Sequence, residues 1–142
     1  MKIFTFSLLI LAFNLCAEEI VFIGSPYSVV KSEKSCDEFV ESGICMDAAF
    51  ELKYNVIEWL NDSTEPETIE FIGFTHFTGL PNFTSFNYAL IHLKKVRRHY
   101  LVKDIKPIIE LGDEYIICVN EQVKYKEKCS KKQTVKQYLG SL

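Results

Sequence analysis

Residues 48–60 read AAFELKYNVIEWL, and this stretch decides the fold. Up to Val56, apolar and polar side chains alternate with a period of two, the pattern of a strand with one buried face and one wet face. After Val56 the parity of the apolar set changes, because Ile57 and Trp59 now flank Glu58. A β-bulge is the usual cause of such a one-residue slip. The stretch therefore predicts the long, bent second strand of a small barrel.

Other strand patterns lie on both sides of this stretch. Residues 19–31 open with a continuous apolar run and then reach Pro26, where a strand must break, bulge or lie on an edge. Residues 68–76 carry apolar side chains on both faces, and Gly73 within them indicates a bend or a close backbone approach. The remaining candidates are residues 87–94, 100–105, 107–111 and 115–119. Seven strand candidates with little helix predict an all-β barrel or sandwich.

The first 17 residues have the composition of an export signal. Lys2 gives a positive start, residues 4–13 are largely apolar, and Ala17 offers a cleavage position. A buried first strand is the alternative, and lipidation at Cys16 is disfavoured because no small residue stands just before it. The apolar run is too short to cross a bilayer comfortably. We therefore expect a secreted or periplasmic protein without a membrane span.

Removal of residues 1–17 leaves 125 of the 142 residues, which suits one domain with a core. We expect a barrel domain over residues 18–121 and a lysine-rich tail over residues 122–142. Three apolar side chains in the tail have the spacing of one helix face and predict a short helix: Val135, Tyr138 and Leu139. Loss of Lys2 changes the formal net charge from −3 to −4. This mildly acidic total gives no reason to expect a nucleic acid as the partner.

Four cysteines remain after that cleavage: Cys36, Cys45, Cys118 and Cys129. An even number of cysteines in an exported chain predicts two disulfides. The spacing favours Cys36–Cys45 and Cys118–Cys129, and a crossed arrangement that ties the early loop to the tail is the alternative. A zinc site is less favoured, because no CxxC pair occurs and no histidine lies within five residues of these cysteines.

The sequence contains no catalytic constellation. His76, His92 and His99 are scattered over a strand end, a strand and a hairpin, and neither a nucleophile signature nor a glycine-rich phosphate loop is present. We therefore assign no catalytic residue, no cofactor and no metal ligand.

Two groups of residues are candidates for a binding surface. The first is aromatic and lies in the broken loop 77–86, which we expect to fold back over a barrel end: Phe77, Phe83 and Phe86. The second is basic, lies at a predicted hairpin tip and could bind an anion: Lys94, Lys95, Arg97 and Arg98. The alternative for the basic group is an ordinary solvated turn.

Asn61 and Asn82 each begin an N-glycosylation triplet in a predicted loop.

The strand order resembles the netrin-like module, the OB-fold barrel of the tissue inhibitors of metalloproteinases. Three stretches carry the resemblance: EIVFIG at 19–24, FELKYNVIEWL at 50–60 and TIEFIGF at 68–74. Residues 87–93, 100–105 and 115–118 are similar to the later strands of exported bacterial relatives. The likeness covers residues 19–120 and implies a small OB-like Greek-key barrel.

This chain departs from those inhibitors at the residues that inhibit. They use a cysteine at the mature N-terminus to grip the protease zinc, whereas cleavage after Ala17 leaves Glu18 first. The early Cys-x-Cys of the family is also missing. Metalloproteinase inhibition is therefore not carried over.

The sequence supports three functional hypotheses. The first is a secreted or periplasmic binding domain without enzymatic activity, which acts as a monomer on a protein or small-molecule ligand. The second is a small exported hydrolase whose site is assembled from dispersed residues. The third is a lipocalin-like carrier with an interior cavity, which requires that the barrel centre is not filled by residues 50–56.

Overall fold

The computed structural model describes residues 18–40, 45–61, 66–76, 79–118 and 131–141. Strands make up most of this part of the chain: β1 (Glu19–Lys31), β2 (Ala48–Trp59), β3 (Thr68–Thr75), β4 (Tyr88–Val96), β5 (His99–Leu111), β6 (Glu114–Cys118) and β7 (Lys132–Thr134). Three short helical elements accompany them: the 3₁₀ turns η1 (Cys36–Glu38) and η2 (Asn82–Ser85), and the helix α1 (Val135–Leu139). The predicted all-β fold with a short C-terminal helix is confirmed. The predicted export signal lies outside the described residues.

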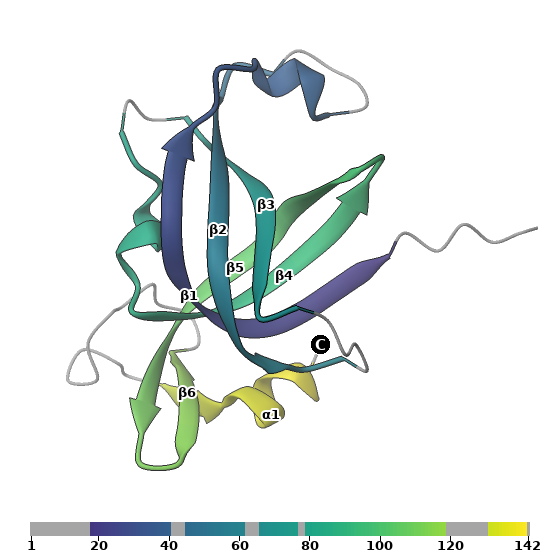
Figure 1. Cartoon of the computed structure of the whole chain (residues 1–142). Coiled ribbons are helices and arrows are strands. Elements are labelled where there is room, and N and C mark those ends of the chain that lie inside the picture. The colour runs from purple at the N-terminus through teal and green to yellow at the C-terminus, as the bar shows by residue number, and fades with distance from the viewer. Residues whose placement is uncertain (1–17, 41–44, 62–65, 77–78, 119–130, 142) are drawn as a thin grey trace, which may run out of the picture.

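The strands form one sheet that curls into a barrel-like ring (Figure 1). Their order is β3-β2-β1-β4-β5-β6-β7, and β3 meets β5 in a parallel pairing of Ile72 with Leu101. The ring of β1 to β5 is therefore nearly complete, although it is not closed as a regular barrel. Because β4 returns to the free edge of β1, the path is a Greek key. This arrangement is the OB-like architecture that the sequence predicts.

The predicted bulge in the 48–60 stretch is present. Ile23 pairs with Glu58, but the next residue, Gly24, pairs with Val56, so Ile57 is the extra residue of β2. The slip lets Val56 and the following tryptophan both pack against the core, as the change of parity indicates. Ile57 itself is 41% exposed.

A second irregularity bends β1 at its proline. Pro26 pairs with Tyr54 and Ser28 pairs with Lys53, which leaves Tyr27 as an extra residue that is 68% exposed. Of the three outcomes that the proline permits, a bulge is the one that the structure shows. The bulge keeps β1 continuous while removing the need for a ladder hydrogen bond from the proline nitrogen.

Side chains fill the centre of the ring. Phe22 and Tyr54 are fully buried there, and Leu52 and Phe71 are almost so. Aromatic rings pack closely, with 5.3 Å between the centroids of Phe22 and Trp59 and 5.1 Å between those of Tyr54 and Phe71. Full burial of each such side chain stabilises the fold by about 1.5–3 kcal/mol.

The segment around η2 covers one side of this core. A Cβ atom added to Gly73 would lie 2.9 Å from Cζ of Phe83 and 2.8 Å from Cδ1 of Leu52, so the close approach predicted at this glycine is confirmed. Phe86 is buried in the same core.

The long strand β5 corrects two predicted boundaries. The stretches 100–105 and 107–111 form one strand that runs through Pro107, and the chain reverses at residues 97–98 alone, since residues 94–96 belong to β4. Beyond the ring, β5 pairs with β6, and α1 packs beside them (Figure 1). Val135 of α1 is buried against a second cluster: Ile23, Leu90, Ile108 and Ile117. The tail also contributes β7, which pairs with β6 and which the sequence did not predict.

Candidate ligand-binding cleft

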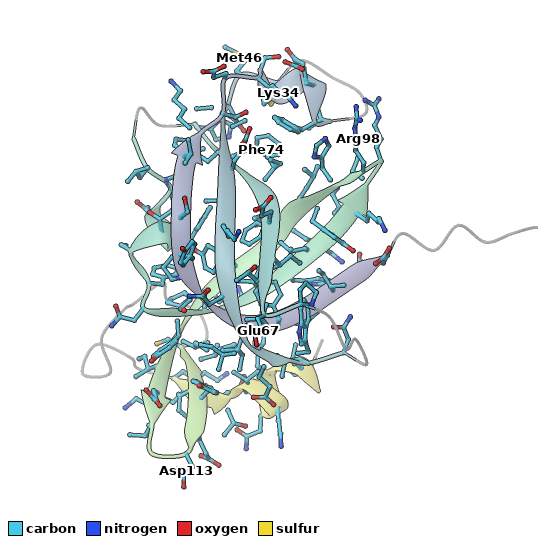
Figure 2. All side chains as sticks on the ribbon, viewed as in Figure 1. Lys34, Met46, Glu67, Phe74, Arg98 and Asp113 are labelled. Carbon is cyan, nitrogen blue, oxygen red and sulfur yellow. A yellow bond between two sulfur atoms is a disulfide. The ribbon has the colours of Figure 1, made fainter. Side chains whose placement is uncertain are left out.

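A cleft of about 480 Å³ opens on the outer face of the sheet. Its floor is formed by neighbouring outward-facing positions on β1, β2 and β3, among them Val30, Glu51 and Ile72. One wall comes from the segment around η1, and the other comes from the tip of the β4–β5 hairpin. Figure 2 labels Lys34 on the first wall and Arg98 on the second.

The η1 wall is held in place by a disulfide. Cys36 and Cys45 are bonded with their Cα atoms 5.6 Å apart, which confirms the predicted local pairing. The carboxylate of Asp37 accepts a 2.8 Å hydrogen bond from the backbone N–H of Cys45 and closes the same loop. Cys118 is also disulfide-bonded, and its predicted partner Cys129 lies outside the described residues.

Phe39 anchors this wall to the barrel. Its side chain is only 2% exposed and packs with Ile72 and Leu101, the two residues that join β3 to β5. The ring of His99 meets the ring of Phe39 edge to face, with 5.2 Å between centroids. The two walls of the cleft therefore touch each other through an aromatic contact.

The hairpin wall contains an unusual backbone conformation. Val96 pairs with His99 across a two-residue turn, and Arg97, the first turn residue, has a φ of 56°. Glycine is the residue that usually fills this position in two-residue hairpins, because a side chain there is strained. The chain instead carries an arginine, followed by Arg98 on the cleft.

Charges on the cleft are partly compensated. Lys53 and Glu70 form an ion pair of 3.3 Å, and the hydroxyl of Ser32 donates a 2.9 Å hydrogen bond to Glu51. Within the part of the chain that the structure describes, no carboxylate pairs with Lys34 or Arg98. The ammonium of Lys34 lies 5.8 Å from the centroid of the Phe39 ring, a cation–π geometry.

The predicted basic group is divided by the fold. Lys95 pairs with Glu18, whose carboxylate also accepts a 2.8 Å hydrogen bond from the hydroxyl of Tyr100. These contacts hold the pKa of Glu18 below its usual value, Lys95 having the larger effect. Lys94 is exposed on β4. Of the four predicted cations, only Arg98 lines the cleft.

The next carboxylate along the chain makes a similar cluster. Glu19 binds the ammonium of Lys103 at 2.8 Å and Nε2 of His92 at 2.9 Å. The hydrogen bond from Lys103, and then that from His92, lower the pKa of the Glu19 carboxyl.

The predicted aromatic group belongs mostly to the core. Phe86 is buried, which corrects the expectation that its ring lies on an exposed surface. Phe83 is partly buried against the same core because Gly73 leaves room for its ring. Phe77 lies outside the described residues.

The histidines lie in three separate places. His76 pairs with Asp47, His92 with Glu19, and only His99 reaches the cleft. The described residues contain no group of three or more metal-ligating side chains that could hold an ion. Nor does any helix among them have the length and apolarity to cross a membrane.

The two glycosylation triplets differ in their surroundings. The amide of Asn61 donates to the carbonyl of Glu19 at 3.0 Å, and its oxygen accepts from the N–H of Val21 at 3.2 Å. Asn82 is exposed at the first position of η2.

Comparison with protein-family models, curated proteins and solved structures finds no match for this chain. The site must therefore be interpreted from its own residues. The sequence had indicated Arg98, but it had not indicated Lys34, Phe39 or His99. An aromatic residue between two cysteines was the one available signal for Phe39, because a disulfide holds such a loop against the barrel.

Proposed function

We propose that this protein is an exported, non-enzymatic binding domain with an OB-like barrel, whose ligand occupies the cleft between η1 and the β4–β5 hairpin. The observation that carries the proposal is the composition of that cleft. Two cations that pair with no carboxylate of the described residues, Lys34 and Arg98, flank an aromatic wall above a partly apolar floor.

The position of the cleft supports this function. OB-like barrels bind ligands on the face of strands 2 and 3, between the loop that joins strands 1 and 2 and the loop that joins strands 4 and 5. The cleft lies at the same place, with η1 in the β1–β2 connection and Arg98 in the β4–β5 connection. The disulfide between Cys36 and Cys45 is compatible with the export that the first 17 residues predict. The netrin-like resemblance remains part of this proposal.

Two observations argue against the other functions. A carrier needs an interior cavity, whereas Phe50, Leu52 and Tyr54 fill the centre of the ring. A hydrolase with a histidine-based site needs its groups in one cleft, whereas the three histidines lie apart.

Affinity capture from the native envelope or secretion fluid tests the proposal. The wild-type protein, Arg98→Glu and Lys136→Glu are immobilised separately, the last as a control with the same charge change on α1. We expect a ligand that the wild type and the control retain and that Arg98→Glu loses. Identical recovery from all three proteins would show that the cleft is not the binding site.

A further inference from the structure

We propose that the cleft recognises an acidic peptide segment of a partner protein, with one carboxylate held between Arg98 and Lys34 and a neighbouring apolar side chain on the floor. This inference rests on the proposed function and names the class of its ligand.

The cations define the first requirement. The guanidinium of Arg98 offers two parallel N–H donors that match a carboxylate, and Lys34 adds a second positive charge on the opposite wall. Since neither cation has a carboxylate partner among the described residues, a ligand carboxylate would break no ion pair that these residues form.

The floor defines the second requirement. Val30 is 56% exposed although it is apolar, and it lies on the cleft beside Ile72 and Phe39, which are themselves buried. An apolar side chain of a ligand would cover Val30 and would gain about 25 cal/mol for each Å² removed from water.

The acidic residues of the cleft argue against a uniform polyanion as the ligand. Glu51 and Glu70 lie on the same floor as the apolar residues. A nucleic acid or a sulfated polysaccharide carries negative charges at short, regular intervals and would bring some of them against these carboxylates. A peptide avoids this repulsion, because it carries apolar as well as acidic side chains. It can therefore place a single carboxylate on the two cations and an apolar side chain on the floor.

The backbone conformation of the hairpin tip also supports a binding role for its arginines. Arg97 occupies a conformation that costs an L-residue about 1–2 kcal/mol and that glycine would adopt without strain. Strain of this kind is found at sites where function fixes the residue. A second arginine beside Arg98 raises the positive potential at the mouth of the cleft.

A defined peptide tests this inference. The probe is a capped, fluorescently labelled peptide of sequence Glu-Leu-Glu-Phe-Glu, titrated against the protein by fluorescence anisotropy. Backbone amide shifts in ¹⁵N spectra then locate its site. We expect shifts around Lys34, Phe39 and His99, and an affinity that falls as salt is added. Arg98→Glu should weaken binding about 5- to 30-fold, since it replaces an attraction by a repulsion at an exposed site.

The controls separate this inference from the proposed function. Lys136→Glu should bind the peptide like the wild type, and a matched Lys-Leu-Lys-Phe-Lys peptide should not bind. Lys34→Glu should also weaken binding, which provides a second variant if Arg98→Glu folds poorly. Absence of binding at millimolar peptide, or shifts that lie elsewhere, would overturn the inference. If a heparin-derived oligosaccharide binds instead and Arg98→Glu abolishes that binding, the peptide class is wrong while the cleft remains the binding site.

Discussion

Replacement of Gly24 by alanine is the sharpest test of the bent β1–β2 pair. Gly24 lies where the ladder slips past Ile57. A Cβ atom added there would stand 2.8 Å from the backbone oxygen of Asn55 and 2.8 Å from Cε2 of the Phe22 ring. Real Cβ atoms almost never approach so closely, so something must move. The oxygen belongs to the paired strand and the ring is fully buried, which leaves neither neighbour free to shift.

The expected cost follows from this crowding. Overpacking by a methyl group in a well-packed core costs about 1–3 kcal/mol, and two close contacts place Gly24→Ala towards the upper end. Alanine recovers about 0.5–1 kcal/mol in a strand because it loses less backbone entropy than glycine. We therefore expect a net loss of about 1–2 kcal/mol in the free energy of unfolding. For a domain of this size, each kcal/mol corresponds to a fall of about 4 °C in Tm.

Urea denaturation followed by circular dichroism measures this loss, and Gly79→Ala is the matched control. Gly79 has no atom within 4 Å of the position that a Cβ would take. The control should therefore stay within about 0.5 kcal/mol of the wild type. Equal stabilities for the two variants would refute the view that the bulge requires a glycine opposite it.

Three further predictions concern charge and backbone. Arg97→Gly should raise the free energy of unfolding by about 0.5–1 kcal/mol, because it relieves the positive φ at some entropic cost; a lower Tm would contradict this. Burial raises the pKa of Tyr54 above its usual 10.0, so its contribution to stability is complete below pH 10 and is lost as pH rises further. In denaturant titrations, Tyr54→Phe should therefore lose less stability than the wild type above pH 10, and parallel curves would disprove the assignment. The pKa of Glu19 is lowered, so its pH dependence runs the other way. Its contribution to folding stability is present above the usual pKa of 4.5 and is lost as pH falls through the folded-state pKa. The stability difference between the wild type and Glu19→Gln should shrink between pH 6 and pH 3, and a constant difference would exclude the ion pairs as its cause.

The alternation along β2 predicted the bulge but not which residue leaves the ladder. The change of parity after Val56 suggested that Ile57 turns inward, whereas Ile57 is the extra, exposed residue and the inward positions are Val56 and Trp59. A pattern of hydrophobic residues records that a slip occurs. The exact position of the slip depends on the partner strand, here on Gly24, which has no side chain to crowd Phe22 and Asn55.

The later strands were harder to predict because their signals are ambiguous. Residues 100–105 and 107–111 were predicted as two strands, yet β5 runs through Pro107 without a break. The proline lies just before Ile108, where the pairing of β5 with β6 begins, so its missing N–H interrupts no ladder on that edge. β7 has only three residues in a lysine-rich stretch and shows no alternation; its pairing with β6 alone defines it.

The cleft could be predicted only in part. A run of basic residues at a hairpin tip pointed to Arg98, but the sequence could not show that Glu18, far away in the chain, pairs with Lys95. Nor could it show that Phe39 packs on Ile72 and Leu101. These contacts depend on how β1, β3 and β5 come together in the ring, which is decided by long-range pairing and not by local pattern.

The disulfide beside the cleft makes the shape of the cleft depend on the redox state of Cys36 and Cys45. Reduction would free the loop that carries Phe39 and Lys34, and one wall of the cleft would then no longer be fixed against the barrel. The main core cluster contains neither cysteine, so reduction should loosen this wall of the cleft before it affects the centre of the ring.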